Sequence, residues 1–401
     1  MILDILILLS WLSVTALVLL LLSLELQLGR APRLPAPDQA DWRTTVRSLR
    51  VVVPVYNEEL NITGCLSALF SALPEDLPVE VVVANDGSTD ATASLAELQC
   101  QRLAGASAHG RVLSVGPRPA DERWCGKNWP ATVASSQPWP DGDPSGQWLL
   151  FLDADVTLLP GSVAAALAEA TLSSADLLSL APRLECGCLA EWLVQPIVAA
   201  LLGLGFPIRS SNDPADATAF AAGPFMLFRR SAYEAVGGHR AVAGEVVEDL
   251  ALARLIKGSG LKLRYLLGVD WVNLRMYRSF AALWEGWTKN WFLGLDRSVI
   301  KAAGSVGVVL LLFAIPWVAA LSAGLAWALS LDQAASLTMA ALAGVALVFA
   351  VRLWSTWRFA TPLKYWWLSW LGAALIAAIV PASVWKTMTG RGWTWRGRSL
   401  A

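Results

Sequence analysis

The chain is poor in charged residues, and this shortage argues against two classes of protein. Only 16% of its 401 residues are Asp, Glu, Lys or Arg, whereas about 25% is usual in soluble proteins. The formal net charge is −1, which gives no electrostatic basis for binding nucleic acid. We therefore expect no nucleic-acid partner, and the chain does not have the composition of an ordinary soluble protein.

The chain also has few histidines, and its cysteines do not form a recognisable pattern. Three of the five cysteines are scattered, and the other two form a single Cys-Gly-Cys at 186–188. With only His109 and His239 in addition, no spacing of ligands suits a zinc site. An odd number of cysteines in a chain of this size indicates reduced thiols and favours a cytoplasmic environment.

The sequence has instead four uncharged runs that are long enough to cross a bilayer, which takes about 20 apolar residues. These runs are 5–24, 302–331, 333–351 and 365–385. The first has no basic start and no cleavage site, so it predicts an uncleaved anchor rather than a signal peptide. The second and third are separated at Asp332 and predict a helical hairpin.

The middle of the chain alternates short β-branched runs with helical stretches. Residues 49–56, 79–86 and 148–155 have the pattern of buried strands, and 58–73 has the apolar spacing of a helix. Strands that alternate with helices predict parallel pairing in an α/β fold. In such open sheets, ligands bind beyond the carboxyl ends of the strands.

Polar side chains follow each of these strands. The first strand ends in Pro-Val-Tyr-Asn-Glu at 54–58, the second in Asn-Asp-Gly-Ser at 85–88, and the third in Asp153-Ala-Asp155. Together and in this order, they resemble the pattern of glycosyltransferase family 2. The resemblance covers roughly 48–290. It implies an α/β GT-A domain that binds a nucleotide-sugar on a mostly parallel sheet, here with N-terminal and C-terminal transmembrane helices.

The resemblance also implies a divalent metal ion, Mg²⁺ or Mn²⁺. Asp155 would bind this metal, and Asp153 would bind the ribose or the metal. Both ions prefer carboxylate oxygens together with substrate phosphates, and side chains at i and i+2 of an extended chain share a face. A helix cap or turn is the structural alternative for this pair. The nucleotide-sugar-binding residues that the resemblance implies are Pro54, Val55, Tyr56, Glu58, Asp86, Lys127 and Asp153, with Asp86 on the base and Tyr56 stacked near it.

A second acidic pair, Glu248-Asp249, begins an amphipathic stretch at 244–260. Acidic residues suit the start of a helix because of its dipole, which is the structural explanation. The resemblance implies that Asp249 deprotonates the acceptor hydroxyl, so that attack on the anomeric carbon inverts it. Glu248 is the alternative base, with Asp249 orienting it.

Several segments are candidates for contact with the acceptor. Lys127 in "WCGKNWPA" resembles a loop of lipid-directed family members, where it would meet a phosphate or hold the acceptor loop; an ordinary exposed lysine is the alternative. Gly223-Pro224 resembles the segment near the acceptor. We expect Gly237-Gly238 to stop a helix and the neighbouring histidine to be structural.

The segment after the acidic pair departs from the pattern of processive synthases, because Arg275-Met-Tyr-Arg278 is followed by serine instead of tryptophan. With "EGWTK", which contains Trp287, it resembles the carotenoid-acid glycosyltransferases. We therefore predict transfer of one sugar from a nucleotide-sugar donor to a lipid-soluble acceptor, a carotenoid first. Hopanoid, sphingolipid and glycerolipid acceptors are the alternatives, followed by a processive polysaccharide synthase and a catalytically inactive scaffold.

The expected arrangement has five parts. They are a membrane anchor at 1–26, a linker at 27–47, a GT-A catalytic domain at 48–298, membrane helices at 299–386 and a basic cytoplasmic tail at 387–401. Arg30 and Arg33 follow the anchor, and basic residues favour the cytoplasmic side. We thus expect an integral protein of the cell or inner membrane with a cytoplasmic catalytic domain.

Two apolar stretches are harder to place from the sequence. The run at 192–208 predicts either a buried helix or a helix in the membrane interface, and we favour the second. The run at 365–385 would carry the basic tail outside if it crossed the bilayer. A re-entrant or interfacial helix bent at Pro381 keeps the tail inside and is our preference.

Overall fold

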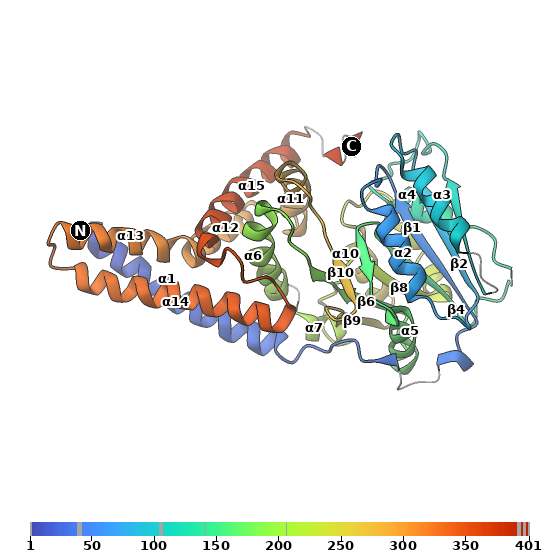
Figure 1. Cartoon of the computed structure of the whole chain (residues 1–401), viewed down its shortest axis with the longest axis horizontal. Helices are drawn as coiled ribbons and strands as arrows, with labels where there is room; N and C mark the ends of the chain where they lie inside the picture. Colours follow the sequence, from blue (N-terminus) through green and yellow to red (C-terminus); the bar gives the residue numbers. More distant parts are fainter. Residues whose placement is uncertain are drawn as a thin grey trace.

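A seven-stranded sheet organises the larger part of the molecule in the computed structural model (Figure 1). The structure describes residues 2–37, 42–103, 107–140, 142–205, 207–390, 394–395 and 398–399. The strand order is β3-β2-β1-β4-β8-β6-β9, and only β8 is antiparallel to its neighbours. The strands are β1 (Ser48–Val55), β2 (Val79–Asn85), β3 (Ala108–Ser114), β4 (Gln147–Leu152), β6 (Leu177–Ala181), β8 (Phe225–Arg229) and β9 (Leu263–Leu267). The mostly parallel sheet confirms the predicted fold class.

Helices cover both faces of this sheet, which explains why its central strands are mostly apolar. Val51 and Val53 of β1 belong to one buried cluster, and Val52 between them belongs to another. The first cluster includes α2 (Ile62–Ala72), α3 (Thr92–Arg102) and α5 (Ser162–Leu172). The second includes α4 (Asn128–Ser135), α8 (Arg230–Ala235) and α10 (Glu248–Gly258). A strand buried on both faces reads as a continuous hydrophobic run.

A small second sheet continues the chain beyond β4. It consists of β5 (Val156–Leu158), β10 (Val272–Leu274) and β7 (Arg183–Leu184), in the order β5-β10-β7. Because β5 starts directly after Asp155 and β10 ends directly before Arg275, their pairing brings these two residues together. The backbone N–H of Arg275 donates to the carbonyl oxygen of Asp155 at 3.3 Å.

The apolar runs form helices that project away from the sheet. Three helical segments are long and apolar enough to cross a membrane: α1 (Ile2–Leu28), α14 (Ala334–Phe359) and 366–389, which contains α15 (Ser369–Thr389). A fourth crossing is formed if α12 (Val299–Phe313) and α13 (Ile315–Ala328), which bend by 45°, are one span. Figure 1 shows α1, α13 and α14 side by side, with the N-terminus at the distal end. The predicted hairpin around Asp332 is confirmed.

A second helical group lies between this bundle and the sheet. It contains α6 (Leu189–Gly205), α11 (Phe280–Gly294), α12 and α15, which share one buried apolar cluster (Figure 1). Nine residues of α6 are buried, so most of this helix fits the buried alternative rather than the interfacial helix that we favoured. Helix α15 continues through Pro381 as one helix.

The predicted linker binds the edge of the sheet, and the predicted tail is partly described. Leu34 N–H donates to the Leu267 carbonyl at 2.9 Å, and Leu267 N–H donates to the Pro32 carbonyl at 2.9 Å. In the tail, β11 (Thr394–Trp395) pairs with β12 (Arg398–Ser399). The arginines at 391 and 396 lie outside the described residues.

Candidate functional site

The loops that follow β1 and β2 are joined by polar contacts at one edge of the sheet. The backbone N–H of Asn57 donates to Ser88 Oγ at 3.1 Å, and Thr89 N–H donates to Asn57 Oδ1 at 2.9 Å. Asn57 has a left-handed φ of 53°, which asparagine tolerates better than most residues. The structure therefore brings the first two sequence motifs to the same edge.

The predicted donor-binding residues of β1 differ in their burial. Pro54 and Val55 are buried within the strand, whereas Tyr56 beyond its end is half-buried. Glu58 is buried, and its Oε2 accepts a hydrogen bond from Asn61 Nδ2 at 2.8 Å. Tyr56 and Glu58 are thus the two side chains that stand at the strand's carboxyl end, while Pro54 and Val55 support them from inside the sheet.

Asp86 is bound to an arginine that the sequence analysis did not identify. Arg118 Nη2 donates to Asp86 Oδ2 at 2.6 Å. The same guanidinium donates to the carbonyl oxygens of Trp124 at 2.8 Å and Gly126 at 2.9 Å. Arg118 thereby connects the end of β2 to the loop that contains Lys127. No local sequence pattern marks this arginine, because Asp86 is distant in the sequence and its other two partners are backbone carbonyl groups.

Lys127 lies between the two acidic motifs rather than on the open surface. Its Nζ forms an ion pair with Asp153 Oδ1 and another with Glu248 Oε1, the latter at 3.1 Å. Burial opposes the charge of Lys127, but the two carboxylates outweigh burial and raise its pKa. The exposed-lysine alternative is therefore wrong, and one ammonium group joins the end of β4 to the start of α10.

A buried asparagine holds Lys127 in this place. Asn128 Nδ2 donates to the carbonyl oxygens of Val242, Ala243 and Glu245, at 2.8, 3.1 and 2.9 Å. These three residues precede Glu248, so Asn128 fixes the beginning of α4 against the segment that leads into α10. No sequence pattern marks Asn128 either.

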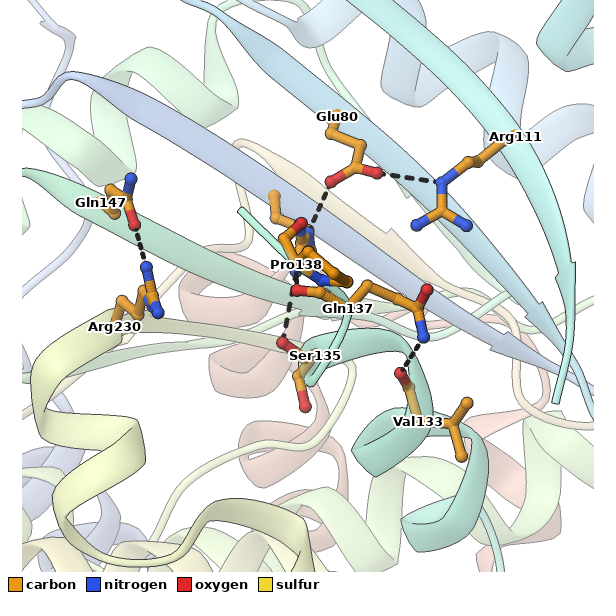
Figure 2. A network of polar contacts seen from close by, with 9 residues as sticks. Glu80, Arg111, Val133, Ser135, Gln137, Pro138, Gln147 and Arg230 are labelled. Carbon is orange, nitrogen blue, oxygen red and sulfur yellow. Dashed lines mark hydrogen bonds and ion pairs between the residues drawn. The ribbon is translucent and has the colours of Figure 1, made fainter. Parts of the chain in front are cut away.

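The other end of α4 is held by Arg50, a fully buried residue of β1. Its guanidinium donates to Glu80 Oε2 at 2.6 Å and to the carbonyl oxygens of Gln137 at 2.7 Å and Pro138 at 2.8 Å. Figure 2 shows this network between the strands and the segment after α4. Both ends of the helix that begins after Lys127 are thus fixed to the sheet domain.

Gly223 and Pro224 connect the two acidic motifs through the backbone. Gly223 N–H donates to Asp249 Oδ2 at 2.9 Å, and Asp153 N–H donates to the Pro224 carbonyl at 3.2 Å. A Cβ on Gly223 would lie 2.9 Å from Asp249 Oδ2 and 3.3 Å from Lys127 Nζ. Glycine is therefore required here for space.

The two members of the second acidic pair have different electrostatic environments. For Asp249, burial and the charge of Glu248 raise the pKa to about 6, although Lys127 opposes this shift. For Glu248, burial acts in the same direction and is the largest single effect, but the charge of Lys127 and hydrogen bonds to the carboxylate together outweigh it, and the pKa is lowered. At neutral pH, Asp249 is consequently the stronger base of the two while still being mostly ionised.

The first acidic pair offers ligands of the kind that a divalent cation prefers. Burial raises the pKa of the Cys65 thiol, and the charges of Asp155, Glu58 and Asp153 raise it further, so the three carboxylates all lie near this buried side chain. Among the described residues, no group of three or more His, Cys, Asp or Glu side chains is arranged to hold a metal. Magnesium sites often have only one or two carboxylates plus substrate phosphates, and Asp153 and Asp155 fit such a site.

The predicted acceptor residues beyond β10 lie in three different environments. Arg275 forms an ion pair with the fully buried Glu191 at 3.7 Å. Arg278 is exposed and donates to Asn61 Oδ1 at 2.7 Å. Trp287 is buried, and its Nε1 donates to Gln195 Oε1 at 3.1 Å. Of the three, Arg275 lies next to Asp155 through the backbone hydrogen bond described above. Trp287 packs inside the helical group.

Two further residues complete the surroundings of the acidic pairs. Lys289 of α11 lies near Glu248 and Asp153; burial lowers its pKa while these carboxylates oppose the shift. The sequence analysis did not single out this lysine. His239 is buried, its Nδ1 is 2.8 Å from the Tyr233 hydroxyl, and burial lowers its pKa to about 3. This environment agrees with the structural role expected for His239, and the left-handed Gly237 and Gly238 follow α8 as expected.

Comparisons with known proteins show what the chain as a whole is similar to. The family model described as "Glycosyl transferase family 2" matches residues 50–112. Two proteins from Staphylococcus aureus strains, both named 4,4'-diaponeurosporenoate glycosyltransferase, are 28% identical over 268 and 275 residues. These alignments cover 65% and 67% of this chain, and 65% and 66% of the relatives. The aligned region thus spans slightly less than two thirds of the relatives' own length.

The fold is also similar to that of a solved glycosyltransferase. The mannosyltransferase PcManGT from Pyrobaculum calidifontis, solved in complex with GDP-Man and Mn²⁺, matches with a TM-score of 0.51 at 17% identity. The match covers 98% of this chain and 100% of that chain. It therefore supports a GT-A-like architecture that includes the helices on either side of the sheet domain.

Proposed function

We propose that this chain, whose residues 50–112 match the family model of glycosyltransferase family 2 and whose fold is GT-A-like, is a membrane-anchored, inverting glycosyltransferase of that family. It transfers one sugar from a nucleotide-sugar to a lipid-soluble acceptor, and a carotenoid is the acceptor class best supported. The observation that carries this proposal is the position of Asp249. It is a half-buried carboxylate with a raised pKa, and backbone hydrogen bonds of Gly223-Pro224 link it to the predicted metal-binding Asp153, which is paired with Lys127.

On the donor side, the strand ends hold the nucleotide and its diphosphate. Tyr56 stacks near the base, and Asp86 hydrogen-bonds to it. Asp155 and Asp153 hold Mg²⁺ or Mn²⁺, which offsets the negative charge of the diphosphate leaving group when bound. The solved mannosyltransferase of similar fold is in complex with Mn²⁺, and this supports a divalent metal here. Lys127, already bound to Asp153, adds a second positive charge beside the leaving group.

On the acceptor side, Asp249 removes the proton from the attacking oxygen. That oxygen forms a bond to the anomeric carbon, and the bond from this carbon to the diphosphate breaks on the opposite face. The electron pair leaves with the nucleoside diphosphate, the proton remains on Asp249, and the configuration is inverted. Each carboxylate oxygen of Asp249 accepts one backbone hydrogen bond, Oδ2 from the N–H of Gly223 and Oδ1 from the N–H of Leu250. Each oxygen keeps a lone pair that can accept the proton of the acceptor.

The alternative base, Glu248, is less suited to this step. Its Oε1 is 3.1 Å from Lys127 Nζ, and the positive charge lowers its pKa. A carboxylate with a lowered pKa accepts a proton less readily. Glu248 acts instead on Asp249, because its negative charge raises the pKa of that neighbour.

The relatives and the helices support the proposed acceptor class. The relatives at 28% identity are named for a carotenoid acid, and this chain has at least three helices suited to a bilayer. A long polyene dissolves in the bilayer, so a membrane-anchored enzyme meets it at the surface. Hopanoid, sphingolipid and glycerolipid acceptors would reach the same surface and are the second choice.

The test is to express the chain in a host that makes carotenoids with hydroxyl or carboxyl ends. We expect a new hexosyl or deoxyhexosyl pigment by mass spectrometry, absent with Asp155→Ala and with Asp249→Ala. Membrane levels of both variants should equal those of the wild type. A glycosylated hopanoid or glycerolipid without a glycosylated pigment would change the acceptor class. Unchanged pigment glycosylation by both variants would contradict the proposed site.

A further inference from the structure

A cavity of about 710 Å³ lies where the end of α1 and the linker meet α7 (Ile208–Asn212) and β9. Its walls include Leu26, Arg30, Pro207, Arg209 and Arg264. None of the residues of the acidic pairs lines it. The proposed transfer reaction therefore gives this cavity no role.

The cavity walls carry an excess of positive charge. Three arginines line it against one acidic residue, Asp213. Arg264 is paired with Glu169 at 2.8 Å, but none of the ion pairs among the described residues includes Arg30 or Arg209, both of which are exposed. Glu25 lies near enough to Arg30 to attract it, but these two described residues form no ion pair. Two arginine side chains that are not held in ion pairs favour an anion, and the planar guanidinium group suits phosphate in particular.

The cavity is also placed at the boundary between apolar and polar parts of the molecule. Leu26 belongs to the last turns of α1, a helix long enough to cross a bilayer, and is 73% exposed. Leu26, Pro32 and Pro207 form an apolar part of the wall. A ligand at this place has access to the bilayer on one side and to the arginines on the other.

The wall opposite α1 is rigidly held. Lys257 Nζ donates to the carbonyl oxygens of Ser210 at 2.8 Å and Ser211 at 3.2 Å, and so fixes α7 to α10. The Asn212 side chain accepts from Tyr265 N–H and donates to the Tyr265 carbonyl, each at 2.7 Å. The cavity is therefore formed by fixed elements, and a bound ligand would connect α1 to the sheet domain.

We propose that this cavity binds the phosphate of an anionic phospholipid, with Arg30 and Arg209 on the phosphate and Leu26 against an acyl chain. Basic pockets at the cytoplasmic ends of membrane helices have the chemistry for such headgroups. A free phosphate compound would offer the same anionic group without the acyl chain. The inference does not depend on sugar transfer, because its test measures binding alone.

The test uses the full chain purified in a neutral detergent. Dioctanoyl phosphatidylglycerol, dioctanoyl phosphatidylcholine and inorganic phosphate are each titrated, and retained ligand is counted by native mass spectrometry with the thermal unfolding midpoint as a second measure. We expect phosphatidylglycerol to be retained and to raise the midpoint. The double variant Arg30→Gln/Arg209→Gln should weaken its binding about tenfold or more.

Two controls separate this site from general attraction to positive charge. Arg102→Gln/Lys364→Gln removes the same charge from exposed positions outside the cavity and should bind phosphatidylglycerol as the wild type does. Arg30→Lys/Arg209→Lys should restore part of the affinity and shows that loss in the glutamine variant is not misfolding. Equal binding of phosphatidylcholine, equal stabilisation by inorganic phosphate, or undiminished binding by the double glutamine variant would each overturn the proposal.

Discussion

If Asp249 is the base, as we propose, it should be the main determinant of the pH dependence of activity. Burial and the charge of Glu248 raise its pKa to about 6, and the charge of Lys127 opposes this shift. Tyr265 also lies near Asp249. A general base is inactive when protonated, so kcat/KM should fall as the pH drops through about 6. Glu248→Gln removes a charge that raises this pKa, and we expect the acidic limb of the pH profile to move to lower pH.

The measurement is a pH profile of kcat/KM for the wild type and Glu248→Gln. Asp249→Asn serves as the control, since it should abolish transfer at every pH. An acidic limb that stays in place in Glu248→Gln would show that another group controls it.

The fit of Gly223 against Asp249 and Lys127 gives a steric prediction. In Gly223→Ala the new Cβ would lie 2.9 Å from Asp249 Oδ2, so the carboxylate must move. Displacement of a catalytic group by about 1 Å can cost about 10²-fold in rate, and we expect a loss in kcat of that order. Gly64→Ala is the matched control, because its Cβ would meet nothing within 4 Å. Equal kcat in both variants would contradict this account.

At the level of the elements, α4 depends on Arg50 for its attachment. Removing one partner of a buried charge network typically costs about 3–5 kcal/mol, and we expect Arg50→Ala to lower Tm by about 6–20 °C in a domain of this size. Arg43→Ala removes an arginine whose pair with Asp76 is more than half exposed on both sides, and such pairs are worth about 1 kcal/mol or less. Thermal unfolding in detergent compares the two variants, and similar Tm values would contradict a structural role for the network.

The sequence predicted the elements that depend on local patterns. The strands at 49–56, 79–86 and 148–155 agree with β1, β2 and β4 to within a few residues, since continuous apolar runs mark strands buried on both faces. The start of α10 at Glu248 was predicted from its acidic first turn. The placement of motif residues at one sheet edge followed from parallel topology.

The sequence could not predict features that depend on distant contacts. In the sequence, Arg50 interrupts an otherwise apolar strand. It is nevertheless fully buried, because Glu80 and a carbonyl group after α4 accept hydrogen bonds from its guanidinium group. Arg118 and Asn128 likewise act on partners far away in the chain. The run at 192–208 looked interfacial because it is uncharged, but α11 and α15 cover the helix that it forms.

At the scale of the whole molecule, charge is distributed unevenly along the α1, α13, α14 bundle. Arg33 and Arg358 lie near the sheet domain, where Arg358 pairs with Glu25 at 2.7 Å and Arg33 donates to the Arg358 carbonyl. Asp4 lies at the opposite end, where it accepts from Gln333 at 2.8 Å. Basic residues favour the cytoplasmic side, so we infer that the sheet domain faces the cytoplasm.

This orientation predicts which surface positions are accessible from outside an intact cell. Ser330→Cys lies in the turn between α13 and α14, and Gly142→Cys lies in an exposed loop of the sheet domain. A membrane-impermeant maleimide should label Ser330→Cys in intact cells, and Gly142→Cys only after lysis. Labelling of the wild type sets the background from the native cysteines. The reverse pattern would contradict the inferred orientation.

The central claim is that this site transfers a sugar with inversion, using Asp249 as the base. The most direct measurement supplies purified wild type and Asp249→Asn with Mn²⁺, a panel of nucleotide-sugars and a carotenoid with a hydroxyl end, and determines the product and its anomeric configuration by mass spectrometry and NMR. Our account predicts one added sugar with a configuration opposite to that of the donor, formed only by the wild type. A product with retained configuration, or one that Asp249→Asn forms at the wild-type rate, would contradict it.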